Sequence, residues 1–327
     1  MKAIVITQPG GPEVLKLKEV DEPRPEGDQI LVRVSATALN RADCLQRRGL
    51  YPAPPHVPAD IPGLEFSGQV EALGPQASRF QAGDRVMGLL GGGGYAEKAV
   101  VSEAQVLEIP QEWSDEEAAA FPEAFFTAYD ALFPQLGLKM GECILIHAVG
   151  SGVGQAALQL CKAAGARTMG TAGSWDKLEK ARQLGLDDAI CYKEQDFGEE
   201  VDRLTRGEGV QAVLDFVGAD YLEGNLKVLA PLGRLIIVGL LSGAQCQADL
   251  SQILRKRLRV MGTVLRARDP WEKAQLTERM RRYVLPLASS GEVIPVLDSI
   301  YELAEAPQAH QRMEANRNFG KIVLRCG

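Results

Sequence analysis

Residues 143–160 read CILIHAVGSGVGQAALQL, and this stretch decides the fold. The apolar run 143–147 predicts a strand, and the amphipathic stretch 153–164 predicts a helix. Between them, Gly152, Gly154 and Ala157 fit the G-x-G-x-x-A variant of the dinucleotide fingerprint. Such glycines let a pyrophosphate approach backbone N–H groups at the positive end of a helix dipole. The alternative is a tight strand–helix turn that binds nothing, because glycine also serves any cramped corner.

Outward from this stretch, strand and helix patterns alternate along the chain. We predict strands at 143–147, 167–171, 189–192, 211–216, 234–238 and 259–264, and helices at 153–164, 175–184, 197–206 and 222–229. This alternation predicts an α/β fold, a doubly wound parallel sheet of the Rossmann type, over residues 121–265. The glycine patch lies at the first strand–helix junction of the run, which favours cofactor binding over a purely structural turn.

Residues 1–120 have a different character. Stretches such as KAIVIT and QILVRVSATAL are rich in β-formers, and Gly-Pro clusters such as PGGPE separate them as turns. This part is therefore predicted to be a mainly β domain. Ser114 and Glu117 form a capping-box pattern that predicts a helix start. A further helix near 271–289 and the strand GKIVLR are predicted to close the chain.

Composition limits the class of protein. The 327 residues carry a formal charge of −7, and an acidic chain argues against general nucleic-acid binding. The six cysteines are widely scattered, which excludes CxxC zinc spacing and indicates a reducing compartment. No apolar run approaches the length of a membrane span. We therefore expect a cytoplasmic protein with no membrane or nucleic-acid partner; the alternative location is a soluble organelle lumen.

The end of the second predicted strand bears on which cofactor binds. An NAD site places Asp or Glu about 20 residues past the glycines, at a strand end. Here the sequence at 171–177 is TAGSWDK, in which Ser174 and Lys177 suit a 2′-phosphate. Asp176 could bond a ribose, but its position near a helix start predicts a capping role. This pattern favours NADP(H) over NAD(H).

Several longer stretches extend the comparison to nearly the whole chain. ALNRADCLQRRGLYPAPP (38–55), PEAFFTAYDAL (122–132) and MEANRNFGKIVL (313–324) join the fingerprint in resembling the medium-chain dehydrogenase/reductase superfamily. Within it, the chain most resembles the zinc-independent quinone oxidoreductases related to zeta-crystallin, especially their tumour-suppressor-inducible group.

This resemblance implies a domain plan. A GroES-like, mainly β catalytic domain would span 1–120 and be completed by 290–327. A Rossmann NADP(H)-binding domain would span 121–265, and a connecting helix 266–289. The resemblance also implies a homodimer through the edge strand near 259–268, RVMGTVLRAR.

Individual cofactor contacts follow from the same resemblance. Ser151, Gly152 and Val153 would contact the pyrophosphate. Without this resemblance, Lys177 would be interpreted as a solvated helix residue. Arg317 fits a phosphate contact and an ordinary surface position equally well. The positions that the resemblance places around the rest of the cofactor are Thr127, Gly173, Ser174, Lys177, Tyr192, Gly218, Val238, Gly239, Leu240, Val264, Leu265 and Arg317.

On the catalytic side, the resemblance implies that Asn40 and Tyr51 border a quinone. Tyr51 either donates its O–H to the quinone or packs against the prolines of YPAPP. Asp43 is interpreted as a structural hydrogen-bond acceptor, and His56 as a weak proton-donor candidate. Two further residues are not expected to react: His147, a core residue, and Cys44, which has no evident charged partner.

The chain differs most clearly from the zinc alcohol dehydrogenases of this superfamily at the positions of their metal ligands. Asn40 and Asp43 occupy the region where those enzymes carry a cysteine ligand, and Leu64-Glu65 replaces their His-Glu pair. The four-cysteine lobe is missing, so we expect no metal. The expected reaction is NADPH-dependent reduction of a quinone, whose ring is already electrophilic. A reductase of activated C=C bonds and an NADPH-binding protein with little turnover are the alternatives.

Overall fold

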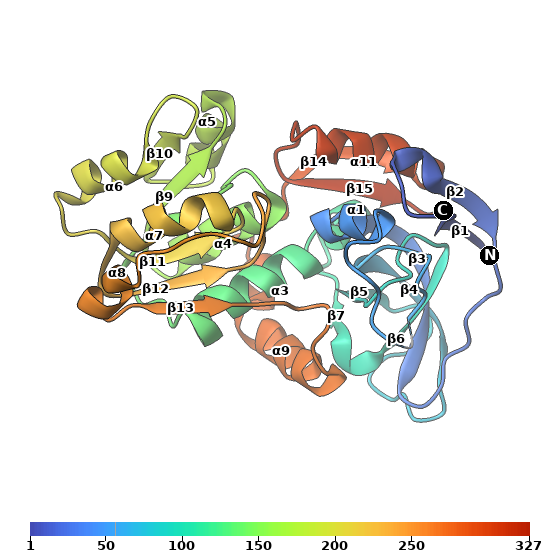
Figure 1. Cartoon of the computed structure of the whole chain (residues 1–327). Coiled ribbons are helices and arrows are strands. Elements are labelled where there is room, and N and C mark those ends of the chain that lie inside the picture. Colours follow the sequence, from blue (N-terminus) through green and yellow to red (C-terminus); the bar gives the residue numbers. More distant parts are fainter. Residues whose placement is uncertain (56) are drawn as a thin grey trace. The chain divides into compact units, whose positions relative to one another are not determined.

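The computed structural model describes residues 1–55 and 57–327 (Figure 1). His56, the proton-donor candidate, lies outside the described residues. The chain divides into two compact units. The first comprises Met1–Phe126 and Leu265–Gly327, and the second comprises Thr127–Val264. The boundary near residue 126 falls within helix α3 (Pro122–Asp130).

A six-stranded parallel sheet forms the second unit. Its order is β10-β9-β8-β11-β12-β13. Strands β9 and β10 are added on one side of β8 and strands β11 to β13 on the other, as in a Rossmann fold. The strands are β8 Cys143–Ile146, β9 Arg167–Ala172, β10 Asp188–Cys191, β11 Val210–Asp215, β12 Leu229–Ile237 and β13 Arg259–Gly262. The helices are α4 Gly152–Ala163, α5 Trp175–Gln183, α6 Phe197–Thr205, α7 Leu222–Val228 and α8 Leu250–Lys256. The predicted parallel sheet is confirmed.

Both faces of this sheet are buried, because successive side chains along each strand point to opposite faces and both sets are covered. Leu145, Val213 and Leu235 pack in one hydrophobic cluster with residues of α6, α7 and α8. Their neighbours Ile144 and Leu214 are also fully buried, and they point to the opposite face because side chains alternate along a strand. Helices α4 and α5 pack against β8, β9 and β10. A sheet buried on both faces explains why its strands read as continuous apolar runs.

The first unit is mainly β. Its main sheet has the order β14-β15-β3-β4-β5-β7, with β6 also pairing with β3, and β1 and β2 form a separate pair. The strands are β1 Lys2–Ile6, β2 Leu15–Glu19, β3 Gln29–Ala38, β4 Glu65–Leu73, β5 Arg85–Leu89, β6 Lys98–Ser102, β7 Val106–Glu108, β14 Leu297–Glu302 and β15 Lys321–Arg325. Because β15 pairs antiparallel with β3, the C-terminal strand belongs to the same sheet as the N-terminal segment.

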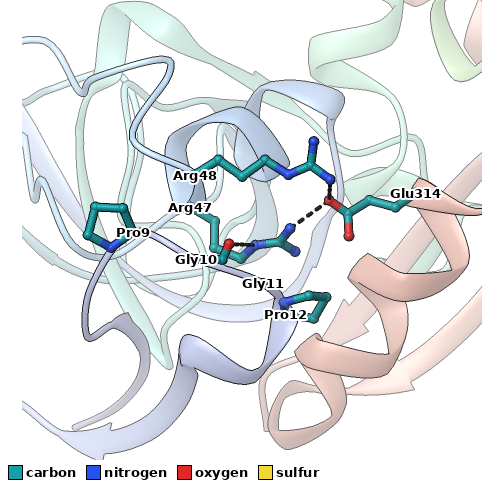
Figure 2. Close-up of a pocket in the computed structure, with 7 residues that line it drawn as sticks. All are labelled: Pro9, Gly10, Gly11, Pro12, Arg47, Arg48 and Glu314. Atoms are coloured by element: carbon teal, nitrogen blue, oxygen red, sulfur yellow. Dashed lines mark hydrogen bonds and ion pairs between the residues drawn. The ribbon is translucent and has the colours of Figure 1, made fainter.

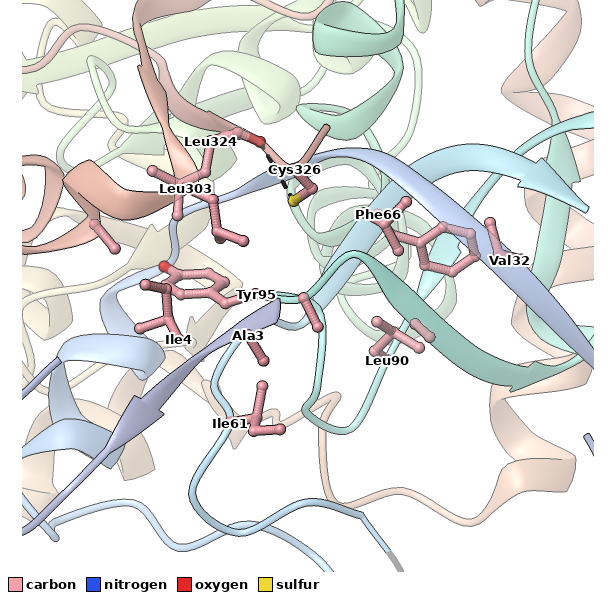
Figure 3. Close-up of a cluster of buried hydrophobic side chains, with 14 of the residues drawn as sticks. Ala3, Ile4, Val32, Ile61, Phe66, Leu90, Tyr95, Leu303, Leu324 and Cys326 are labelled. Atoms are coloured by element: carbon pink, nitrogen blue, oxygen red, sulfur yellow. Dashed lines mark hydrogen bonds between the residues drawn. The ribbon is translucent and has the colours of Figure 1, made fainter. Parts of the chain in front are cut away.

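The core of the first unit draws on both ends of the chain. Figure 3 shows Ile4, Phe66 and Tyr95 in one cluster with Leu303 and Leu324. Both Phe66 and Tyr95 are fully buried. Burying an aromatic side chain contributes several kcal/mol, on the order of 3 to 5 when it is truncated to alanine. The C-terminal segment is thus held by the sheet and by the core.

Helices of the first unit begin and end where the sequence gives a physical reason. Ser114 and Glu117 form the predicted capping box of α2 (Asp115–Ala119), with Glu117 N donating to Ser114 Oγ at 3.2 Å. The other helices are α1 Arg41–Arg47, α9 Pro270–Tyr283, α10 Leu285–Ser289 and α11 Ala306–Glu314. The segment 266–289, predicted as one connecting helix, forms two, because Pro286 cannot continue the first.

That segment also has direct bonds within the first unit. Arg281 on α9 donates to Val106 O at 2.6 Å and pairs with Glu108 at 3.2 Å. The described residues contain no helix that is both long and apolar enough to cross a membrane.

Candidate functional site

The carboxyl ends of the parallel strands bring the predicted cofactor positions together in the second unit. The loops after β8, β9, β11 and β12 all leave the same edge of the sheet, because every pairing in it is parallel. Val149 N donates to Thr171 O at 3.0 Å, and Val238 N donates to Asp215 O at 2.7 Å. These bonds tie neighbouring loops at the edge where ligands of such sheets bind.

The glycine patch is a tight corner that leaves N–H groups free at the start of a helix. Ser151 caps α4, with Gly154 N donating to its Oγ at 3.0 Å. A Cβ on Gly154 would lie 2.5 Å from Ala148 O, so only glycine lets the helix approach the loop this closely. Within the described residues, the N–H groups of Gly152 and Val153 have no acceptor, as expected for the first helix positions. Two free N–H groups and the helix dipole suit a pyrophosphate.

The tip of β9 presents hydroxyl groups and cations. Ser174 precedes α5, and its side chain makes no capping bond. The Tyr192 hydroxyl lies over Gly173, where a Cβ would come within 2.7 Å of it. The same Cβ would come within 3.4 Å of the Lys193 side chain, a cation that sequence reasoning missed. Lys177 is half-buried in the first turn of α5. These groups match the chemistry of a 2′-phosphate.

The prediction that Asp176 caps α5 is wrong. The N-cap position is Ser174, and the exposed Asp176 carboxylate instead pairs with Lys180 at 3.3 Å. This is a surface i,i+4 ion pair on one helix, a geometry that the side-chain spacing favours.

The loops after β11 and β12 meet at the remaining predicted positions. Gly218 is buried with φ 87°, a conformation that favours glycine, and its N–H donates to the Asp215 carboxylate. A Cβ on Gly218 would lie 2.9 Å from the Leu240 side chain. Leu240 and Val264 are 53% and 57% exposed, so both present apolar surface to solvent. Exposed apolar side chains beside strand ends suit contact with a nicotinamide or ribose. Val238, Gly239 and the α3 residue Thr127 are half-buried.

The other predicted positions belong to the first unit. Leu265 is buried and Arg317 is exposed. Asn40 and Tyr51 are half-buried. The roles assigned to all the cofactor and substrate positions stay predictions.

A buried ion pair lies at the position where a zinc dehydrogenase would carry ligands. Lys321 Nζ donates to Glu65 Oε1 at 2.7 Å, to Asn40 Oδ1 at 2.7 Å and to Leu39 O at 2.9 Å. Asn40 Nδ2 in turn donates to Glu65 Oε1 at 2.8 Å. Glu65 is fully buried and Lys321 is 5% exposed. The ammonium is therefore satisfied by three oxygens, and both ends of the Asn40 amide are used.

These residues do not fit a metal ion. The oxygens of Glu65 and Asn40 already hold the ammonium of Lys321, which a metal ion would have to displace. Among residues 1–55 and 57–327, no group of three or more His, Cys, Asp or Glu side chains could hold a metal.

Asp43 is confirmed as a structural acceptor. It accepts from Asn40 N at 2.7 Å, from Gly63 N at 3.1 Å and from the Tyr95 hydroxyl at 3.2 Å. Burial raises the pKa of Asp43 to about 6, against the lowering effect of these backbone bonds. Its carboxylate holds the loop that positions Asn40.

The same network continues from Tyr95 to a pocket. His310 Nε2 lies 3.2 Å from the Tyr95 hydroxyl, and Arg47 Nη1 lies 3.1 Å from His310 Nδ1. Figure 2 shows Arg47 and Arg48 converging on one oxygen of Glu314 in this pocket, which Pro9, Gly10, Gly11 and Pro12 complete. It contains none of the predicted site residues.

His147 is confirmed as a core residue, and Cys44, which we expected to be unreactive, is also buried. Burial raises the pKa of Cys44 to about 12, so its thiol stays protonated and unreactive. His147 lies 3.0 Å from Thr171 Oγ1 and 2.7 Å from Asn225 Oδ1. Burial lowers the pKa of His147 to about 4, and the ring is therefore neutral at physiological pH.

Tyr51 is held by a buried cation that sequence reasoning missed. The Arg266 guanidinium lies 5.2 Å from the centre of the Tyr51 ring and donates to Tyr51 O at 3.3 Å. Arg266 is itself fixed by Gln46 Oε1 at 2.7 Å and by Gly91 O at 2.7 Å. The Tyr51 hydroxyl has no hydrogen-bond partner among the described residues, so it is available to a ligand. The contact with the guanidinium fixes the ring orientation.

Lys321 and Glu65 carried a sequence signal that could have been read. Each is a charged residue inside an otherwise apolar stretch, GKIVL and GLEF. A charge in a buried strand is rarely tolerated without a partner, so the two would be expected to pair.

A Rossmann unit with free N–H groups at the start of α4, joined in one chain to a mainly β unit, is typical of nucleotide-dependent oxidoreductases. Two family models match: the zinc-binding dehydrogenase family over residues 152–279 and the alcohol dehydrogenase GroES-like domain over 26–111. A quinone oxidoreductase of Pseudomonas aeruginosa is 35% identical, with 99% of each chain covered. The chain belongs to the medium-chain dehydrogenase/reductase superfamily.

Solved structures agree with this assignment. The Escherichia coli quinone oxidoreductase complexed with NADPH is 30% identical, with a TM-score of 0.91 over 99% of this chain and 100% of that one. An NAD-dependent alcohol dehydrogenase is 35% identical, with a TM-score of 0.91 over 100% of both chains. Relatives with this fold therefore differ in their cofactor and in their substrate.

Proposed function

We propose that this protein is an NADPH-dependent quinone oxidoreductase. One observation carries the proposal. The free N–H groups of Gly152 and Val153 share a sheet edge with the β9 tip, where Ser174, Lys177 and Tyr192 lie. An adenosine diphosphate carrying a 2′-phosphate matches these two groups of donors. The full-length similarity to quinone oxidoreductases supports the choice of substrate class.

The residues fit the cofactor in chemistry as well as in place. Gly152 and Val153 would bind the pyrophosphate through N–H groups, and the Ser151 hydroxyl keeps a proton to donate while its oxygen caps α4. Ser174, Lys177 and Tyr192 would bind the 2′-phosphate. When bound, the reduced nicotinamide supplies a hydride.

The acceptor side belongs to the first unit. Lys321 and Glu65 form a neutral pair that positions Asn40, and Arg266 orients the ring of Tyr51. Burial raises the pKa of Tyr51 above its ordinary value, and Glu123 adds to the effect, so the phenol keeps its proton. A neutral O–H donor suits a quinone oxygen that gains negative charge during reduction.

The direct test mixes the pure protein with NADPH and a panel of quinones and enones, and follows the loss of NADPH by absorbance. Quinone-dependent oxidation of NADPH is the expected result. Oxidation with enones alone would replace the proposed substrate class by activated C=C bonds. NADPH binding without oxidation would indicate a binding protein with little turnover.

Replacing Tyr51 by phenylalanine tests the acceptor side. Tyr51→Phe removes only the hydroxyl, so kcat for quinone reduction is expected to fall roughly tenfold, which corresponds to one lost hydrogen bond to a charged group. The dissociation constant for NADPH should stay unchanged, as fluorescence titration would measure. An unchanged kcat would leave Tyr51 with only a packing role.

We also propose that the protein forms a homodimer through strand β13. This strand is the edge of the six-stranded sheet, and Val260 on it is 40% exposed. Unpaired edge strands of this kind can pair with a second copy. Light scattering after gel filtration should give twice the chain mass for the wild type and the mass of one chain for Val260→Glu. A monomeric wild type would contradict the proposal.

A further inference from the structure

Glu123 is a half-buried carboxyl group at the start of α3 that the mechanism above leaves without a role. Its backbone N–H donates to Glu65 Oε2 at 2.8 Å, which fixes the first turn of α3 beside the Glu65–Lys321 pair. The Glu123 side chain has no hydrogen-bond partner among the described residues, although it keeps some exposed surface. A partly accessible carboxyl without a partner can meet a ligand.

The charged surroundings of Glu123 all belong to the first unit. They lie on six parts of the chain: α1, the loop after it, β4, β15, the segment that leads into α9, and α9 itself. The groups that interact electrostatically with Glu123 are Asp43, Tyr51, Glu65, Lys321, Arg266 and Lys273.

This environment keeps Glu123 neutral. Burial raises the pKa of Glu123 to about 8, the Glu65 charge adds to the effect, and Lys321 opposes it. Glu65 is neutralised by its contact with Lys321, whereas Glu123 has no such direct partner. At neutral pH Glu123 therefore carries an O–H group rather than a charge, and near its pKa it can release that proton readily.

We propose that Glu123 donates the proton that completes reduction of the acceptor, which rests on the quinone oxidoreductase function proposed above. The hydride delivers two electrons and one hydrogen to the quinone. The hydroquinone needs one further proton, so the Glu123 O–H bond breaks as an O–H bond forms on the acceptor oxygen. Water returns a proton to the carboxylate after the product leaves. Tyr51 orients the same oxygen by donating a hydrogen bond to it. Its hydroxyl keeps its proton, because burial raises the pKa of this phenol above its ordinary value.

Glu123→Gln keeps the shape of the side chain and removes the transferable proton. We expect kcat for quinone reduction to fall by roughly 100-fold at pH 7, within the usual contribution of a general acid. Wild-type kcat should decline as the pH rises above about 8, where Glu123 loses its proton. This alkaline decline should disappear in Glu123→Gln, and NADPH affinity should stay within about twofold. The matched control is Glu272→Gln, since Glu272 is an exposed glutamate in the first turn of α9.

A second measurement does not depend on turnover. In protein labelled with 13C at the glutamate carboxyl carbons and free of cofactor, one resonance should titrate near pH 8 and be absent from Glu123→Gln. If Glu123→Gln fails to fold, Glu123→Asp should keep the alkaline decline at a reduced kcat.

The outcomes separate this inference from the proposed function. A wild type that does not oxidise NADPH with any quinone overturns the proposed function, and with it the proton transfer to a quinone. A wild type that turns over while Glu123→Gln keeps both its rate and its alkaline decline overturns the role of Glu123 alone.

Discussion

Lys321→Met is expected to lower the free energy of unfolding by about 3–5 kcal/mol, the usual cost of removing one partner from a buried ion pair. The substitution keeps the apolar stem of the side chain but leaves the Glu65 carboxylate fully buried. Its remaining partners would be Asn40 Nδ2 and Glu123 N, two neutral donors. Asn40 would also lose the donor to its Oδ1. The destabilisation therefore comes from an uncompensated charge and not from lost packing.

Denaturation by guanidinium, followed by tryptophan fluorescence, measures this effect. Two of the three tryptophans, Trp113 and Trp271, report on the first unit. Lys98→Met is the matched control, because Lys98 pairs with Glu22 and Glu71 at the surface. Surface pairs of this kind contribute about 1 kcal/mol or less. Equal losses in the two variants would show that the Lys321–Glu65 pair has no special role.

Gly154→Val is expected to abolish measurable cofactor binding, although the parallel sheet of the second unit should still form. Any Cβ at this position meets Ala148 O at 2.5 Å and Val149 Cα at 2.9 Å, and both are backbone atoms that cannot rotate away. The loop after β8 must then separate from α4. This displaces the N–H groups of Gly152 and Val153, which the pyrophosphate needs together. Overpacking of this kind also costs about 1–3 kcal/mol of stability.

Isothermal titration with NADPH measures the loss. Gly198→Ala is the control, because Gly198 is also in the first turn of a helix, α6, and its Cβ would lie nearest to side-chain atoms, Asp196 Oδ1 at 3.0 Å and Val228 Cγ1 at 3.9 Å. The control variant should bind NADPH as the wild type does. Full affinity in Gly154→Val would mean that the glycine patch is only a corner and binds no phosphate.

The sequence predicted the second unit well because a sheet buried on both faces gives continuous apolar strands. Strands β8 to β11 begin and end within one residue of their predicted bounds. Strand β12 was predicted from Arg234 but begins at Leu229. The added part of the strand accompanies an irregularity between Val210 and Ala212 in the pairing of β11 with β12. Helix α8 was missed, since it has seven residues and no buried side chain.

The candidate site divides in the same way. Positions near strand ends, such as Ser151 and Ser174, could be predicted because a motif fixes their place in the chain. The Glu123 environment could not, because it joins residues that are 58 or more positions apart in the chain. No local pattern reports such distant contacts. The pKa of Glu123 depends on them directly.

The most direct test of the cofactor site is the ratio of dissociation constants for NADPH and NADH, measured on the wild-type protein by titration at low salt. Charge-assisted hydrogen bonds from Lys177 and its neighbours to a 2′-phosphate should make NADPH bind roughly tenfold more tightly or better. Lys177→Ala should weaken NADPH and leave NADH unchanged. Equal affinity for the two cofactors in the wild type, or tighter binding of NADH, would contradict a 2′-phosphate site at the end of β9.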